Sequence, residues 1–218
     1  MSRTSGELAH NRRMILAAGV IDATGMAACP GAVLVEGDQI LAAGSPEQIG
    51  SVPSAELVQM PEMLLLPGLV NAHAHLDLSG DGVWPAAGND FRGWVGQVRA
   101  LRAAQTPALC KQAVQRGIEL SLAGGTSCIG DIAGHSPMAT AKALRESSLR
   151  GVSFQEVFGL GDRQNATVDR MRAMAEGGPL EAQGIRLGLS PHAPYSCGPA
   201  VFGAAAECGL PLTTHLEE

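Results

Sequence analysis

From Met63 onward the sequence alternates between short apolar runs and helical segments. The apolar runs, which are typical of strands, are Leu64–His75, Thr126–Asp131, Gly151–Phe158, Ile185–Ser190 and Pro211–His215. The segments between them read as helices at about 90–105, 107–123, 136–150, 165–176 and 198–208. Repeated strand–helix units predict a parallel sheet, and we expect its first strand to be buried on both faces. The pattern favours an α/β fold, a TIM-type (β/α) barrel with about five of eight strands present.

The residues before this alternation read as short strands and tight turns. Gly31–Glu36 and Gln39–Gly44 flank Gly37-Asp38, a two-residue hairpin signal. Glu56–Met60 reads as a further short strand. We predict a small N-terminal β-sandwich module over residues 1–63 and a (β/α) barrel over residues 64–218. The second part is shorter than the roughly 250 residues of a typical barrel, so we expect an incomplete one.

Histidines collect just after the predicted strands, at the edge where barrel enzymes carry their active sites. His73 and His75 end the first run, and residues i and i+2 of an extended chain point to the same side. Two imidazoles aimed at one point suit a zinc or ferrous ion. The alternative is a pair of core histidines. His192 and His215 follow the fourth and fifth runs, which favours a metal centre.

The composition limits the classes of partner. With 218 residues, 45% of them hydrophobic, the chain can bury a sizeable core. A net charge of −6 argues against nucleic acid or an anionic membrane as the main partner, and no apolar run is as long as a membrane span. Five cysteines without a Cys-x-x-Cys pair predict a reducing, cytoplasmic setting. We expect a small-molecule substrate, and a homo-oligomer is compatible with these numbers.

Four segments in a fixed order carry a family resemblance. They are Pro67–His75, Gly125-Thr126, Ser190–Cys197 and Thr214–Glu218. Together they resemble the amidohydrolase superfamily, and most closely its cytosine/adenosine-type deaminase branch, which also has a β module. The resemblance covers nearly the whole chain from Met14 on. It implies a hydrolase of non-peptide carbon–nitrogen bonds, with hydrolytic deamination of an aminopurine nucleoside or related base as the leading expectation.

The resemblance also implies roles for individual histidines. His73 and His75 match the first-strand metal ligands of the branch, and His215 matches its fifth-strand ligand. His192 matches a fourth-strand residue that contacts substrate and not metal. On this reading, water activated by the metal attacks an electron-poor ring carbon that carries an amino group.

The catalytic acid/base implied by the resemblance is Glu218, three residues after His215. Chain geometry alone favours Glu217, which shares a face with His215 in a straight strand. A sixth-strand histidine and an eighth-strand aspartate of the family have no counterpart in the sequence. We therefore expect a C-terminally truncated chain, and an inactive fragment lacking the last metal ligand is an alternative to the active enzyme.

Lysine usage indicates how many metal ions to expect. The chain has only Lys111 and Lys142, both in predicted helices. The two-metal members of the superfamily usually bridge their ions with a modified lysine on the fourth strand, and Ile185–Ser190 has none. One divalent metal is favoured, zinc first and iron as the alternative.

The substrate is the least constrained part of the prediction. Leu76–Ser79 and Phe91–Trp94 look like the subgroup that includes aminofutalosine deaminases. Phe91 and Trp94 lie three apart on a predicted helix, where they either line the mouth of a pocket or pack against a neighbouring element. Trp94 is our candidate substrate contact. The alternative function is another amidohydrolase, acting on a cyclic amide or a triazine-type ring.

Two aspartates near the predicted site remain ambiguous in the sequence. Asp77 shares the parity of His73 and His75, so it either supports a metal ligand or lies on a surface loop. Asp131 ends the second strand, where we expect it to cap the helix that follows.

Overall fold

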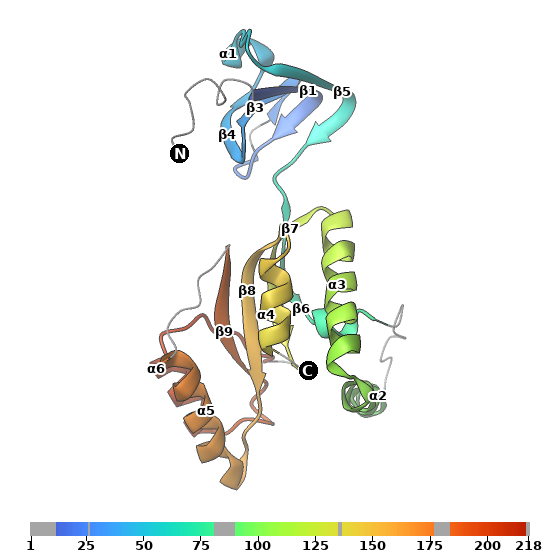
Figure 1. Cartoon of the computed structure of the whole chain (residues 1–218). Helices are drawn as coiled ribbons and strands as arrows, with labels where there is room; N and C mark the ends of the chain where they lie inside the picture. Colours follow the sequence, from blue (N-terminus) through green and yellow to red (C-terminus); the bar gives the residue numbers. More distant parts are fainter. Residues whose placement is uncertain (1–11, 26, 81–89, 135–136, 177–183, 217–218) are drawn as a thin grey trace, which may run out of the picture. The chain divides into compact units, whose positions relative to one another are not determined.

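The structure, a computed structural model, describes residues 12–25, 27–80, 90–134, 137–176 and 184–216 (Figure 1). It divides the chain into two compact units, Met1–Pro67 and Gly68–Glu218.

The first unit is built on a five-stranded sheet. Its strands are β1 (Arg12–Ile21), β2 (Ala27–Ala28), β3 (Gly31–Glu36), β4 (Gln39–Gly44) and β5 (Glu56–Leu65). β1 pairs antiparallel with β3 and parallel with β5, and β3 continues into β4 through the predicted hairpin. Gly37 adopts the positive φ of 60° that this tight turn requires. The short helix α1 (Pro46–Ile49) starts with a capping box between Ser45 and Gln48.

The apolar run that was expected to form one strand is divided between the two units. Leu64 and Leu65 extend β5 and pair with Gly19 and Val20 of β1. A new strand, β6 (Leu69–Ala74), starts after Pro67. Proline has no N–H to donate, which explains a break at this point.

The second unit contains a parallel sheet of four strands in the order β6-β7-β8-β9. The other three are β7 (Thr126–Ala133), β8 (Arg150–Val157) and β9 (Ile185–Pro191). The expectation of a first strand buried on both faces is wrong for β6, whose Leu69 and Val70 are 57% and 68% exposed. β6 is an end strand of the described sheet, so it has only one strand neighbour.

Helices join successive strands as the sequence predicted. They are α2 (Phe91–Ala104) and α3 (Pro107–Ala123) before β7, α4 (Pro137–Arg145) before β8, α5 (Gln164–Glu176) before β9, and α6 (Pro199–Glu207) after it. Short 3₁₀ turns, η2 (Leu76–Leu78) and η3 (Gly161–Arg163), follow β6 and precede α5. α3 begins at Pro107 with the side chain of Thr106 accepting a hydrogen bond from the Leu109 N–H.

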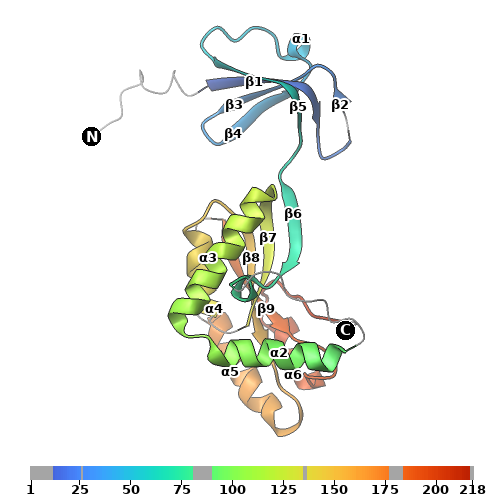
Figure 2. The same ribbon diagram turned by 90° about the vertical axis from the view of Figure 1, so that its right-hand side faces the viewer.

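Two apolar clusters fill the space between helices and sheet. In one, side chains of α3 and α4 pack on β7 and β9 around Val114, Leu144 and Ile129. In the other, α5 and α6 pack together beside β8 and β9 around Met171 and Val201. α2 instead runs crosswise at the end of the sheet toward which the strand arrows point (Figure 2). It therefore lies beside the carboxyl ends of the strands.

The predicted fifth strand is an extended segment held to β9 by a single bridge. Leu189 pairs with Leu212, and the backbone bonds Leu189 N to Pro211 O and Thr213 N to Leu189 O fix the register. Its direction is parallel to β9, as predicted. The segment brings His215 to the same edge as His192.

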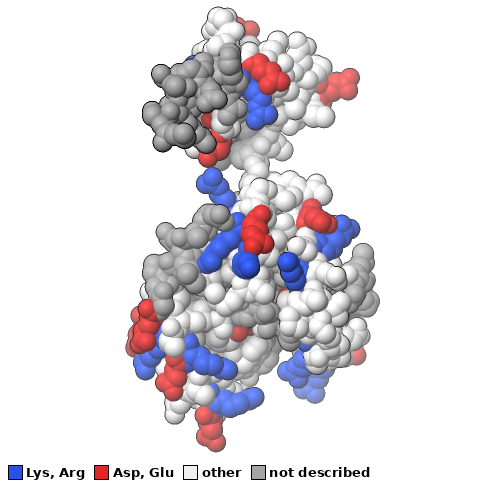
Figure 3. Space-filling model, viewed as in Figure 1, with Lys and Arg blue, Asp and Glu red and all other residues white. Residues whose placement is uncertain are grey.

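None of the helices in the described ranges is long and apolar enough to cross a bilayer. Acidic and basic side chains are interspersed over the face of the second unit in Figure 3, with wide neutral areas between them.

Candidate metal centre

Three histidines meet at the carboxyl edge of the parallel sheet. His73 and His75 come from the end of β6, and His215 comes from the extended segment beside β9. The ring centroid of His73 lies 5.2 Å from that of His75 and 4.7 Å from that of His215. One ligand nitrogen from each ring lies within 4.8 Å of the other two. A tetrahedral zinc ion needs these nitrogens about 3.3 Å apart, so modest side-chain shifts complete the cluster.

The backbone fixes which nitrogen of His215 faces the cluster. The Nδ1 of His215 lies 3.1 Å from the carbonyl oxygen of His192 and donates a hydrogen bond to it. Nε2 is then the atom that is available as a ligand. A second ring bond of this kind is how proteins orient metal-binding histidines.

His75 is held in the neutral state that metal binding requires. Burial lowers its pKa to about 3, and the neighbouring Arg102 cation acts in the same direction. The Arg102 Nη2 lies 3.3 Å from the Nδ1 of His75. Neutral imidazole is the ligand form of histidine.

Arg102 is placed by two buried carboxylates. Its Nε lies 3.2 Å from the Asp77 Oδ2, and its Nη1 lies 2.9 Å from the Glu156 Oε2. Burial acts to lower the pKa of Arg102, but the two carboxylates outweigh burial and the pKa is raised. Asp77 is 1% exposed, so the surface-loop alternative for this residue is wrong. It contacts Arg102, which in turn contacts the candidate metal ligand His75.

Asp131 anchors the chain just after the two β6 histidines. It is fully buried in β7, and its carboxylate accepts hydrogen bonds from the Leu76 N–H at 3.1 Å and from the Ser153 hydroxyl at 3.4 Å. Burial raises the pKa of Asp131 to about 7. Its described contacts lie with the strand ends and not with α4, contrary to the expected helix cap.

His192 lies beside the three-histidine cluster and faces a further carboxylate. Its Nε2 is 4.0 Å from the Glu156 Oε1, and its Nδ1 is 2.8 Å from the Ser196 hydroxyl. The rings of His192 and Phe158 stack at 4.6 Å. Glu156, His192 and His215 form a second group whose ligand atoms lie within 4.8 Å of one another.

These side chains line one cavity of about 610 Å³. His75, His192, His215 and Glu156 are among its lining residues, and α2 contributes Trp94 and its neighbours. The rings of Phe91 and Trp94 stack with centroids 6.0 Å apart. Both aromatic residues therefore lie at the pocket, as one of the two sequence readings predicted.

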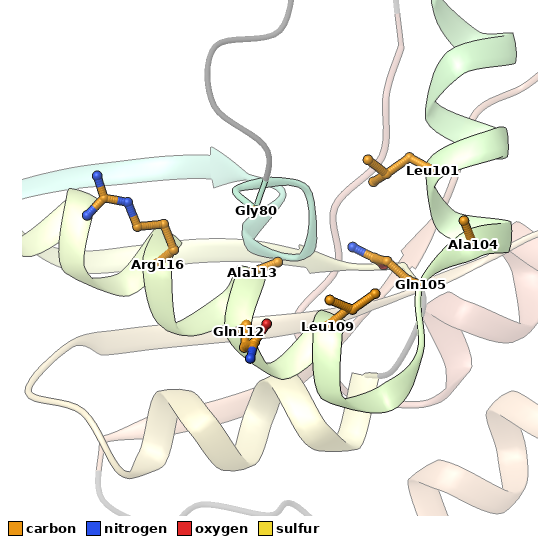
Figure 4. Close-up of a pocket in the computed structure, with 8 residues that line it drawn as sticks. All are labelled: Gly80, Leu101, Ala104, Gln105, Leu109, Gln112, Ala113 and Arg116. Atoms are coloured by element: carbon orange, nitrogen blue, oxygen red, sulfur yellow. The ribbon is translucent and has the colours of Figure 1, made fainter.

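A second hollow, of about 380 Å³, lies between α2, α3 and Gly80 (Figure 4). Its lining has no histidine and no carboxylate, and its polar side chains are Gln105, Gln112 and Arg116. Figure 4 shows leucine and alanine side chains between them. It offers no catalytic groups, so the cavity at the three histidines is the candidate site.

One predicted site residue lies outside the described part of the chain, and two residues at the site were not predicted. Glu218, the expected acid/base, and its alternative Glu217 lie outside the described residues. Arg102 and Glu156 were missed in the sequence. Arg102 is one of several arginines on a helix, and Glu156 lies within an apolar strand. One signal could have identified Glu156: like Asp131, it is a charged residue near the end of a predicted parallel strand.

Comparison with known proteins agrees with this geometry. A family model described as "Amidohydrolase family" matches residues 64–218. The chain belongs to the amidohydrolase family. Its members are metal-dependent hydrolases, which suits a cluster of three imidazoles at a strand edge.

Among curated relatives, an aminodeoxyfutalosine deaminase from Deinococcus radiodurans is 29% identical over 89% of this chain and 47% of its own length. A 5-methylthioadenosine/S-adenosylhomocysteine deaminase from Symbiobacterium thermophilum is 29% identical over 86% of this chain and 44% of its own. An adenosine deaminase from Helicobacter pylori is 31% identical over 71% of this chain and 38% of its own. The chain spans about half the length or less of these relatives.

Solved structures show the same fold. The Helicobacter pylori aminofutalosine deaminase in complex with methylthio-coformycin has a TM-score of 0.73 at 24% identity, covering 94% of this chain and 50% of its own. A triazine hydrolase from Arthrobacter aurescens reaches 0.77 at 23% identity, covering 94% and 53%. The predicted partial barrel with an N-terminal β module is confirmed.

Proposed function

We propose that the protein containing this chain is a metal-dependent deaminase that hydrolyses the amino group from an aminopurine nucleoside or a related base. The observation that carries the proposal is the convergence of His73, His75 and His215 within 4.8 Å at the strand edge of an amidohydrolase barrel. The deaminase names of three relatives at 29–31% identity support the substrate class.

The residues fit a single divalent ion. Three imidazoles suit zinc, and zinc appears with the atrazine chlorohydrolase and the Xanthomonas campestris adenosine deaminase of the same fold. When bound at three imidazoles with an open position, zinc would lower the pKa of water to about 7 and supply a nucleophile at neutral pH. The His73 ring, the neutral His75 ring and the His215 Nε2 are the groups that would hold it.

The remaining side chains would bind and orient the substrate. His192 and Trp94 line the cavity beside the cluster, where they would contact a planar heterocycle. Glu218 is the proposed acid/base, taking a proton from water and giving it to a ring nitrogen. A proton transfer of this kind contributes roughly 10²–10⁴-fold to the rate. The five free cysteines fit the cytoplasmic setting that we propose.

Hydrolysis of a triazine-type ring is the second candidate. Its support is structural, because triazine hydrolases align with a TM-score of 0.77. The cluster and the aromatic wall suit any flat, electron-poor ring. Chloride release from atrazine, measured in parallel with ammonia release, separates the two activities.

The proposal is tested by ammonia release from the complete gene product loaded with zinc. The substrates are adenosine, 5′-methylthioadenosine, S-adenosylhomocysteine and aminodeoxyfutalosine. We expect zinc-dependent release from at least one of them and none from His215→Ala. A protein that binds zinc stoichiometrically and releases no ammonia from any of the four is not the proposed deaminase.

A further inference from the structure

Glu156 is a carboxylate in the wall of the cavity with one oxygen fixed and one oxygen left over. It is the next-to-last residue of β8, and its side chain is 1% exposed. Its Oε2 accepts a hydrogen bond from the Arg102 Nη1 at 2.9 Å. Its Oε1 is buried and has no hydrogen-bond partner among the described residues.

The fixed oxygen is held by a rigid ion network. Arg102 is clamped between Glu156 and Asp77, whose side chains are each 1% exposed. A separation of 2.9 Å is typical of a charge-assisted bond between a guanidinium and an ionised carboxylate. Glu156 therefore presents its second oxygen in one orientation, with little conformational freedom to lose on binding.

The leftover oxygen lies on the side of the carboxyl group that is nearest to His192, a lining residue of the cavity. Glu156 lines the cavity together with His75, His192 and His215. On that side the His192 Nε2 lies 4.0 Å from Oε1, which is too far for a hydrogen bond. Burying an acceptor without a donor is costly, so such an atom is a strong candidate for an incoming donor.

We infer that Glu156 is a specificity-determining residue, whose Oε1 accepts a hydrogen bond from an N–H or O–H group of the substrate. Arg102 is the positioning residue that holds this acceptor beside the cluster. This inference rests on the proposed function and deepens it. The pocket selects rings or sugars that carry a donor, and a substrate without that donor leaves the Glu156 oxygen unpaired.

An aminopurine nucleoside has two kinds of donor that fit this description. One is the exocyclic amino group at the reacting carbon, and the other is the pair of 2′ and 3′ ribose hydroxyls, which 5′-methylthioadenosine also carries. Purine riboside lacks the first, and 2′,3′-dideoxyadenosine lacks the second. Comparing both with adenosine identifies the donor that Glu156 accepts.

The test measures kcat/KM for adenosine and 2′,3′-dideoxyadenosine, and the inhibition constant of purine riboside, on the zinc-loaded complete gene product. Glu156→Gln keeps the shape but presents an amide in place of the carboxylate. We expect it to lower kcat/KM for adenosine about 10–100-fold, the range for one charge-assisted hydrogen bond. The penalty should fall below about threefold for the one analogue that lacks the donor. Zinc content should equal that of the wild type.

Two further variants keep the test decisive. Glu207 is an exposed carboxylate that pairs with Arg172 on the helical surface. Glu207→Gln should change neither the kcat/KM values nor the inhibition constant. The triple variant Glu156→Gln, Arg102→Met and Asp77→Asn removes all three charges of the network, so no buried charge is left unpaired and the loss of selectivity should persist.

The outcomes separate this inference from the proposed function. If the wild type neither deaminates adenosine-type nucleosides nor binds purine riboside, the proposed function fails and this inference fails with it. If the wild type is active but Glu156→Gln shows one equal penalty for all three nucleosides, or none, only this inference is overturned. Loss of zinc in Glu156→Gln would also overturn it, because the residue would then act through the metal.

Discussion

The backbone N–H and the ring Nδ1 of His215 both donate to the carbonyl oxygen of His192, at 2.8 and 3.1 Å. One carbonyl thus sets the position of the extended segment and the rotation of the imidazole. The contact uses the backbone of His192, whereas the His192 side chain lines the cavity and is hydrogen-bonded through Nδ1 to the Ser196 hydroxyl. The position of His215, the proposed ligand, therefore depends on the backbone of His192, the proposed substrate contact. A substitution of the His192 side chain leaves that backbone contact in place.

His215→Ala should abolish zinc retention, because only two of the three imidazoles remain. His192→Asn is the matched control, because it keeps the carbonyl that orients His215. We expect zinc content near one per chain in the control and near zero in His215→Ala, measured by elemental analysis after dialysis. Equal zinc content in the two variants would contradict the ligand assignment.

Arg102→Met should destabilise the second unit by about 3–5 kcal/mol, because it leaves the carboxylates of Asp77 and Glu156 buried without a cation. Arg102→Lys keeps the charge but loses the fork that reaches both carboxylates, so we expect an intermediate loss. Urea unfolding of the zinc-free protein gives the free energies. Arg172→Met removes an exposed ion pair with Glu207 and should cost at most about 1 kcal/mol. Equal losses in Arg102→Met and Arg172→Met would argue against a structural network.

Asp131→Asn should change the pH dependence of stability. The pKa of Asp131 is about 7 in the folded protein against 3.8 for the free side chain, so the folded state binds more protons between these pH values. The contribution of this carboxyl to stability is therefore present below about pH 4 and is lost as the pH rises toward 7. Asparagine keeps an acceptor for the Leu76 N–H and has no such loss. Relative to wild type, the variant should gain on the order of 3–4 kcal/mol from pH 4 to pH 8.

Chemical unfolding at a series of pH values, with zinc removed by chelation, measures this difference. Asp162→Asn is the control, because Asp162 is an exposed residue in the η3 turn. Its difference from wild type should stay constant across the series. A constant difference for Asp131→Asn as well would mean that its carboxyl titrates normally.

Local sequence signals predicted most of the elements correctly, because each depends on a few neighbouring residues. The hairpin at Gly37-Asp38 needs only its two turn residues, and α3 begins where Thr106 and Pro107 provide a cap and a fixed φ. The strand predicted from Leu64 onward was wrong at Leu64–Pro67, where the chain passes from β5 to β6. The residues on both sides of the unit boundary are apolar, so the pattern shows no break. Only Pro67, which has no N–H to donate, marks the end of a strand.

The candidate site was predictable only where a residue type is rare and its position in a strand is informative. His73, His75 and His215 met both conditions. Arg102 and Glu156 are 54 residues apart, and their contact depends on how α2 lies across the strand ends. No local pattern encodes that arrangement. The burial of Asp77 has the same origin, because Arg102 and the Gln105 amide reach it from α2 and the turn that follows.

Trp94 offers an optical test of the cavity. It is one of two tryptophans, it is half-buried, and it lines the cavity next to Phe91. A planar ligand that stacks beside it should alter its fluorescence, and methylthio-coformycin, the ligand of the Helicobacter pylori structure, is a suitable probe. Trp94→Phe should remove the signal and keep the affinity within about threefold, because phenylalanine also stacks. Trp94→Ala should weaken binding about 2–10-fold, the range for one aromatic contact. Trp84→Phe leaves Trp94 as the one tryptophan of this sequence and should keep the signal, whereas loss of the signal in Trp84→Phe would assign it to Trp84.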